Sequence, residues 1–177
     1  RAYPDIAARS TLRPHDVTPL RAIRNSRLEN PVLTIGVIGA ISHHKGAAVI
    51  ADLAKAISAS GAPVKIVVIG SVDAWCPPEI VTQTGPYKQE DLPKIVEKHH
   101  INIALMPSIC PETFSFVAHE IISMKLPLVS LDLGAQADLV RSQATGHVSC
   151  RQDGPGLLEE LIAFDRQLHP LTLKVLS

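Results

Sequence analysis

Two glutamates in the stretch PETFSFVAHE, Glu112 and Glu120, have the residue type and the spacing to do chemistry. If both followed one helix, their separation of eight residues would give about 12 Å of rise and about 80° of rotation. Two carboxylates that act on one glycosidic bond need about 5–10 Å between them. The spacing therefore argues against joint action on one bond and allows contacts with two ends of one elongated ligand.

The residues alone leave a plainer interpretation open for both acids. Glu112 would then be an acid that the helix dipole favours near the start of a helix, and Glu120 would be a solvated position two turns in. Thr113 and Ser115 are the possible N-caps of that helix.

A lysine in the stretch GAISHHKG, residues 39–46, is a second candidate. Gly39 allows a sharp exit from a strand, and Lys45 lies at the expected start of a helix. The helix dipole disfavours a cation there, so the lysine suggests a bound anion such as phosphate. The stretch matches neither the P-loop nor the dinucleotide-binding pattern. The alternative is an exposed lysine on a surface loop.

Two further features of the loops are weaker. Tyr87 follows a Gly-Pro turn and could line a pocket for a base, or simply be part of that turn. His43 and His44 are adjacent and so face different ways, and no further ligands stand at the spacing of a zinc site.

These residues need strands and helices to position them, and apolar runs alternate with helical patterns about six times along the chain. The expected strands are 32–40, 64–70, 79–85, 101–107, 127–134 and 146–150, and the expected helices are 44–61, 89–99, 113–125, 135–143 and 154–169. This alternation predicts an α/β fold, an open parallel sheet of about six strands with helices on both faces, Rossmann-like in arrangement. Ligands bind such sheets outside the carboxyl ends of the strands. The loops at that edge are 39–46, 70–78, 85–88, 107–115 and 132–136.

The composition restricts the class of protein. A chain of 177 residues can form one sizeable core, and 3% aromatic residues against 46% hydrophobic residues predict an aliphatic one. A net charge of zero argues against nucleic-acid binding. Three scattered cysteines indicate a reducing compartment, and no apolar run reaches the length of a membrane span. We expect a cytoplasmic location, with a peripheral place at the inner membrane face as a variant for the full-length protein.

Taken together, the segments from about residue 32 to 165 resemble the C-terminal, nucleotide-sugar-binding domain of family 4 glycosyltransferases with the two-domain GT-B architecture. VIGAISHHKGAAVIADLAKA resembles the family's glycine-exit loop, and TGPYKQEDLPKIV resembles its base-binding turn. The block from IALMPS to QADLV is similar to the family's E-x(7)-E helix and the strand after it, and it is the most specific of the three.

The resemblance implies roles for the matching positions. Glu112 would contact the donor sugar near the reacting centre, and Glu120 would bind the ribose hydroxyls of the nucleotide. Lys45 would hold the diphosphate, and the turn around Tyr87 would contact the base. The backbone N–H groups of Thr113, Phe114 and Ser115 would also face the phosphates.

The reaction implied by the resemblance is transfer of the sugar with retention at the anomeric carbon. The substrate would be a nucleotide-diphosphate sugar, with no cofactor and no metal. The acceptor, a glycan or a lipid, would be held by an N-terminal domain. We expect residues 1–31 to be a linker or tail from that missing domain, residues 32–177 to be the nucleotide-sugar-binding domain, and the domain alone to be inactive in transfer.

One position departs from the family pattern, in which an arginine stands five residues before the lysine as a second phosphate clamp. That position is Ala40 here, and His44 is a candidate substitute because imidazole can donate to phosphate. Two other functions stay open: a nucleotide-sugar epimerase of the same architecture, and a non-catalytic nucleotide-binding module, for which Ala40 is the evidence.

Overall fold

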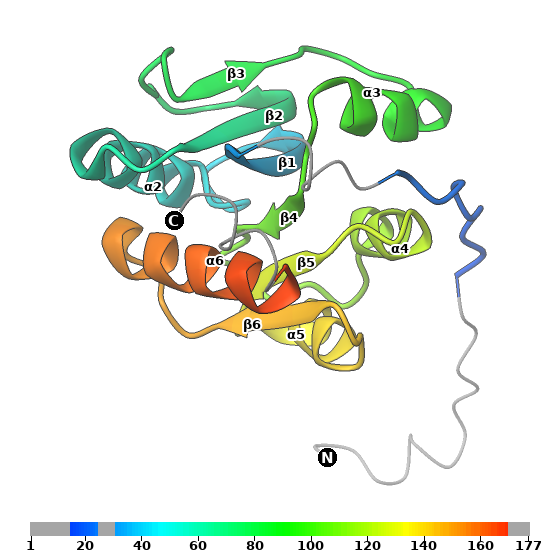
Figure 1. The fold of residues 1–177 in the computed structure, drawn as a ribbon. Coiled ribbons are helices and arrows are strands. Elements are labelled where there is room, and N and C mark those ends of the chain that lie inside the picture. The colour runs from blue at the N-terminus through cyan, green and yellow to red at the C-terminus, as the bar shows by residue number, and fades with distance from the viewer. Residues whose placement is uncertain (1–14, 25–30, 170–177) are drawn as a thin grey trace, which may run out of the picture.

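A computed structural model of the chain describes residues 15–24 and 31–169, and in these residues a single parallel sheet carries helices on both faces (Figure 1). The strands are β1 (Leu33–Ile41), β2 (Val64–Val72), β3 (Val81–Gln83), β4 (Ile103–Met106), β5 (Leu128–Leu131) and β6 (Gly146–Ser149). Their order is β3-β2-β1-β4-β5-β6, and every neighbouring pair is parallel. The predicted open parallel α/β fold is confirmed.

Each face of the sheet has its own aliphatic core and its own helices. The helices are α2 (Ala47–Ser60), the short 3₁₀ helix η1 (Gln89–Asp91), α3 (Leu92–Lys98), α4 (Phe116–Ser123), α5 (Gly134–Arg141) and α6 (Gly154–Leu168). Residues of α2 and α6 pack in one core with alternate residues of the strands. Residues of α3, α4 and α5 pack in the other. The central strands are therefore buried on both sides, which explains their continuous β-branched runs.

The main differences from the predicted boundaries lie where the helices begin. Helix α2 begins at Ala47 and not at residue 44, because turn hydrogen bonds to the carbonyl groups of Ser42 and His43 precede it. Helix α4 begins at Phe116 and not at residue 113, because Ser115 is extended and caps it by accepting a hydrogen bond from the Ala118 N–H. Periodicity does not distinguish such turns from a first helical turn, so the predicted helices were too long.

The segment of residues 15–24 lies along α4 and reaches α3. Leu20 and Ile23 pack against the core on that side of the sheet, and their N–H groups donate to Ser123 Oγ and to the carbonyl oxygen of Met124. Arg21 donates two hydrogen bonds to the carboxylate of Glu97, at 2.7 and 2.6 Å. The other residues of the predicted tail, 1–14 and 25–30, lie outside the described residues, as do residues 170–177 at the end of the predicted domain.

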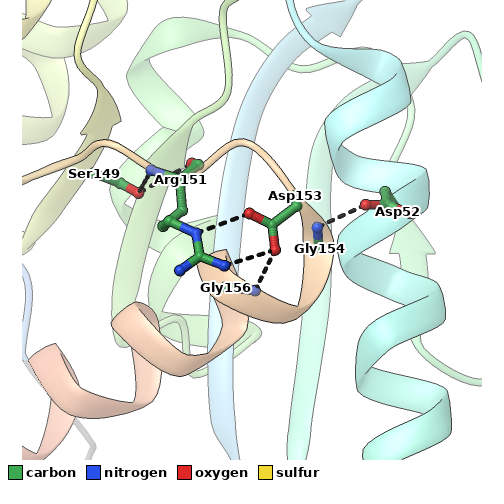
Figure 2. A network of polar contacts seen from close by, with 6 residues as sticks. All are labelled: Asp52, Ser149, Arg151, Asp153, Gly154 and Gly156. Atoms are coloured by element: carbon green, nitrogen blue, oxygen red, sulfur yellow. Dashed lines mark hydrogen bonds and ion pairs between the residues drawn. The ribbon is translucent and has the colours of Figure 1, made fainter.

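Helices α2 and α6 meet at a polar junction (Figure 2). The Asp153 carboxylate caps α6 by accepting a hydrogen bond from the Gly156 N–H at 2.8 Å, and Arg151 binds the same carboxylate. The Gly154 N–H donates to Asp52 of α2 at 2.6 Å. A side chain at Gly154 would clash with the backbone of Asp52, so glycine allows the two helices to approach this closely.

We predict that Asp52→Ala lowers the free energy of unfolding by about 1–2 kcal/mol, because it leaves the buried N–H of Gly154 without its acceptor. Asp52→Asn keeps an oxygen acceptor and should lose less. Urea unfolding followed by circular dichroism measures both. Equal stability of Asp52→Ala and the wild type would show that the hydrogen bond does not hold the helices together.

The ion pair between Arg21 and Glu97 predicts a dependence of stability on pH. The hydrogen bonds from Arg21 lower the pKa of Glu97 from 4.5 to about 2. Because the pKa is lower in the folded chain, the pair stabilises the fold fully above pH 4.5 and loses that effect as pH falls toward 2. Arg21→Ala should therefore be less stable than the wild type at pH 7, and the two should converge on acidification. Urea unfolding at a series of pH values tests this, and a difference that stays constant down to pH 2 would contradict it.

Candidate functional site

An open pocket of about 320 Å³ lies beyond the carboxyl ends of β1 and β4. It brings together four residues that the sequence singled out: Lys45, Glu112, Phe114 and Ser115. The remaining lining is Ile38, Ile41, Leu105, Met106, Pro107, Ser108, Phe116 and Val117. The pocket thus has mainly apolar walls, with one lysine and one glutamate among its lining residues.

The loop that carries Lys45 is held against the loop after β4 by backbone contacts. Gly46 has a φ of 88°, and a side chain at this position would clash with the carbonyl group of Pro107. The Ile109 N–H donates to the carbonyl oxygen of His44 at 3.2 Å. These contacts fix the place where Lys45 enters the pocket wall.

Glu112 lies in the loop before α4 and not on the helix. Its carbonyl oxygen accepts a hydrogen bond from the Ala135 N–H at 3.0 Å, at the first turn of α5. A side chain at Gly134 would lie within 3.0 Å of the Glu112 backbone, so glycine is needed for this approach. The helical rise and rotation estimated for Glu112 and Glu120 therefore do not apply, and neither does the interpretation of Glu112 as a first-turn acid. Helix α5, and not α4, holds Glu112 in place.

The amino end of α4 is also part of the pocket. Phe116 and Val117 are its first two residues, so their N–H groups have no acceptor within the helix. Thr113 and Phe114 stand before the helix, and Ser115 caps it. The N–H groups that an anion would meet therefore extend beyond the predicted residues 113–115 into the first helical turn.

Aromatic rings gather at the same end of α4 in a cluster that the sequence does not predict. Phe114 stacks on His119 with ring centroids 4.5 Å apart, and it lies edge to face with Phe116 at 4.9 Å. His15, from the segment along α4, lies 4.6 Å from Phe114. No periodic pattern links residue 15 to residues 114–119, because the contact is made only in the folded chain.

A second, smaller pocket of about 280 Å³ lies at the same edge of the sheet, at the ends of β1 and β2. Gly39 and Tyr87, both predicted donor-binding residues, line it together with Ala40, Gly70, Ser71 and Pro86. The predicted residues are therefore divided between two pockets, with Lys45 and Glu112 in the larger and Gly39 and Tyr87 in the smaller.

Glu120 is buried, with 8% of its surface exposed, so its interpretation as a solvated helix position is wrong. Burial raises the pKa of its carboxyl group, and the hydrogen bond from Gln89 opposes that change. Burial also raises the pKa of Tyr87, and the charge of Glu120 adds to this effect. Glu120 and Tyr87 are therefore electrostatic neighbours although 33 residues separate them in the sequence.

Three more predicted positions have less definite surroundings. The Nδ1 atom of His44 lies 3.8 Å from Cys110 Sγ, and His44 is not among the residues that line either pocket. Ala40 is exposed and offers no charge. Thr113 is exposed as well. Lys45 is the one cation that lines either pocket in the described part of the chain.

Residues 15–24 and 31–169 contain neither a cluster of metal-ligating side chains nor a membrane-spanning helix. No three side chains of histidine, cysteine, aspartate or glutamate come together there as a metal site would require. None of the helices there is long and apolar enough to cross a membrane.

Solved structures with a similar fold include a sucrose-phosphate synthase and a glycosyltransferase. Alr3699/HepE from Anabaena, in a crystal structure with UDP and glucose, matches with a TM-score of 0.61 and 16% identity over 80% of this chain and 40% of its own. Sucrose-phosphate synthase from Thermosynechococcus elongatus matches with a TM-score of 0.65 and 18% identity, over 86% of this chain and 41% of its own. A glycosyltransferase from Rickettsia africae matches with a TM-score of 0.61 and 15% identity, over 84% of this chain and 46% of its own. The chain thus spans less than half the length of these structures.

No curated protein matches the sequence of this chain. A family model does match it. The model of the family described as "Glycosyl transferases group 1" matches residues 32–164, which cover the whole sheet and most of α6. The chain therefore belongs to the group 1 glycosyl transferases.

Proposed function

We propose that this chain is the C-terminal, donor-binding domain of a retaining family 4 glycosyltransferase. The observation that carries the proposal is the larger pocket, which places Lys45, Glu112 and the amino end of α4 around one space. A nucleotide-diphosphate sugar has a doubly charged centre with a sugar on one side and a ribose on the other. The two pockets and the buried Glu120 offer a complementary feature for each part.

The diphosphate would lie between Lys45 and the amino end of α4. The N–H groups of Phe116 and Val117, which have no acceptor within the helix, and the helix dipole favour an anion there, and Lys45 adds a full positive charge. Thr113, Phe114 and Ser115 would contribute further backbone N–H groups from the loop. These groups would offset the charge that builds up on the leaving diphosphate as the bond to the anomeric carbon breaks.

The nucleoside would extend from the diphosphate toward the smaller pocket. Tyr87 would contact the base beside Gly39, and Glu120 would accept hydrogen bonds from the ribose hydroxyl groups. Glu112 would contact the sugar on the other side, near the reacting carbon. The separation of the two glutamates into different surroundings supports their assignment to the two ends of one donor.

Transfer needs an acceptor, and the chain spans 40% of Alr3699/HepE, which was solved with UDP and glucose. We propose that an N-terminal domain of the full-length protein binds the acceptor, a glycan or a lipid. In this scheme the nucleotide sugar is the substrate and no cofactor is assigned. The proposed place of the full-length protein is the cytoplasm or the inner face of its membrane.

One observation favours a second function, a nucleotide-binding module without turnover. Ala40 stands where the family pattern has a second phosphate-binding cation, and the side chain of His44 lies beside Cys110. Lys45 alone would then hold the diphosphate, more weakly than two cations would. Incubation of the full-length protein with nucleotide sugars distinguishes the functions: transfer supports the first, and binding without turnover supports the second. Change of the sugar without an acceptor would support the third possibility, an epimerase.

We predict that Lys45→Ala weakens binding of UDP, GDP or ADP by about tenfold to a hundredfold, because a charge-assisted contact with phosphate is lost. Isothermal titration calorimetry of the 177-residue chain measures this. Lys65→Ala is the matched control, since Lys65 is exposed at the amino end of β2, away from the pockets. Equal affinity of Lys45→Ala and the wild type would refute the phosphate role.

We also predict that Glu112→Ala separates sugar binding from nucleotide binding. The variant should bind UDP-glucose about tenfold or more weakly if glucose is the sugar, because hydroxyl groups lose a charged acceptor, and it should bind UDP as the wild type does. The same titrations with Glu159→Ala, a change to an exposed acid of α6, are the control. A panel of UDP-, GDP- and ADP-sugars covers the other donors. An equal loss for sugar nucleotide and free nucleotide would contradict the sugar contact.

A further inference from the structure

Gln89 makes a contact that neither the sequence pattern nor the family match assigns. Its Nε2 atom donates a hydrogen bond to Oε1 of Glu120 at 2.7 Å, across 31 positions of sequence. Gln89 itself is exposed, whereas Glu120 is buried. An exposed glutamine therefore holds the carboxylate of a buried glutamate.

Both ends of this contact are fixed by their backbones. Glu120 lies in the middle of α4, where its carbonyl oxygen accepts hydrogen bonds from the Met124 N–H at 3.1 Å and from Ser123 Oγ at 2.8 Å. Gln89 begins η1, and its carbonyl oxygen accepts a hydrogen bond from the Leu92 N–H. The hydrogen bond between the two side chains thus joins two rigid elements and leaves the carboxylate little freedom to rotate.

The contact also helps the carboxylate to stay charged. Burial of Glu120 raises its pKa, and the hydrogen bond from Gln89 lowers it. Gln89 Nε2 is the one side-chain donor to this carboxylate in residues 15–24 and 31–169. The second oxygen, Oε2, therefore remains available as an acceptor.

The position of Gln89 in the chain relates it to the nucleotide site. It follows directly after residues 85–88, the turn that carries Tyr87 into the smaller pocket. Its side chain then reaches back to α4, whose amino end forms part of the larger pocket. Gln89 thus joins the turn proposed to contact the base to the acid proposed to bind the ribose.

We infer that Gln89 is a positioning residue of the nucleotide site, which fixes one oxygen of Glu120 so that the other is presented to the ribose hydroxyl groups. This inference rests on the proposed function, because it takes Glu120 as the ribose-binding acid. Gln89 acts through Glu120 and need not touch the ligand. Its loss should therefore reduce the preference for ribose and leave the contacts with base and phosphate in place.

The test compares ribose with a sugar that lacks both hydroxyl groups. Calorimetry on the 177-residue chain gives dissociation constants for UDP, GDP and ADP and for their 2′,3′-dideoxy counterparts. The variants are Gln89→Ala, which removes the donor, and Gln89→Glu, which keeps the size but places a second carboxylate against Glu120. Glu90→Ala is the matched control, an exposed residue of the same 3₁₀ helix.

The wild type and Glu90→Ala should prefer the ribonucleotide by about tenfold or more, as loss of hydrogen bonds to a charged acceptor requires. Gln89→Ala should reduce that ratio several-fold, and Gln89→Glu at least as much, with the dideoxy affinities nearly unchanged. If Gln89→Ala leaves the ratio of ribonucleotide to dideoxynucleotide affinity at the wild-type value, the inference is overturned and the proposed function stays intact. An equal loss of affinity for both kinds of nucleotide has the same meaning. A wild-type chain that binds none of the nucleotides overturns both.

Discussion

The contact between the loop of residues 42–46 and the loop after β4 is the constraint on which the candidate site depends. Gly46, in a left-handed conformation, lies against the carbonyl group of Pro107, and the Ile109 N–H binds the carbonyl oxygen of His44. In a parallel sheet the carboxyl ends of the strands lie at one edge, and the space beyond that edge is open unless loops enclose it. This contact closes one side of that space and places Lys45 in its wall. The second side comes from α5, whose first turn holds the backbone of Glu112.

The candidate site also contains a buried acid, Glu120. A carboxyl group is costly to bury unless it is hydrogen-bonded. The α4 side of the sheet is strongly apolar, with Ala118 and Ile121 of the same helix fully packed. A buried carboxyl group therefore needs a hydrogen-bond partner, and Gln89 of η1 supplies one to Glu120. The cost of burial and the need for a partner both fit a group that is kept for ligand binding.

Much of this arrangement could be predicted from residues and spacing. The six strands, their parallel direction and the edge that carries the pockets follow from apolar runs and their alternation with helical patterns. Two kinds of feature were not predicted: local turn geometry at the starts of helices, and side-chain contacts between residues far apart in the sequence. Turn geometry at Ser115 and Gly46 makes two helices shorter than predicted. The burial of Glu120 and its bond to Gln89 depend on packing between elements 31 residues apart, and a sequence pattern does not report that.

The proposed binding of a diphosphate by Lys45 and the amino end of α4 can be tested with a crystal structure of the chain grown with a nucleotide diphosphate sugar. We expect diphosphate oxygens within hydrogen-bond distance of Lys45 Nζ and of backbone N–H groups between Thr113 and Val117, with the sugar beside Glu112. Phosphates bound elsewhere, with Lys45 turned toward solvent, would contradict it.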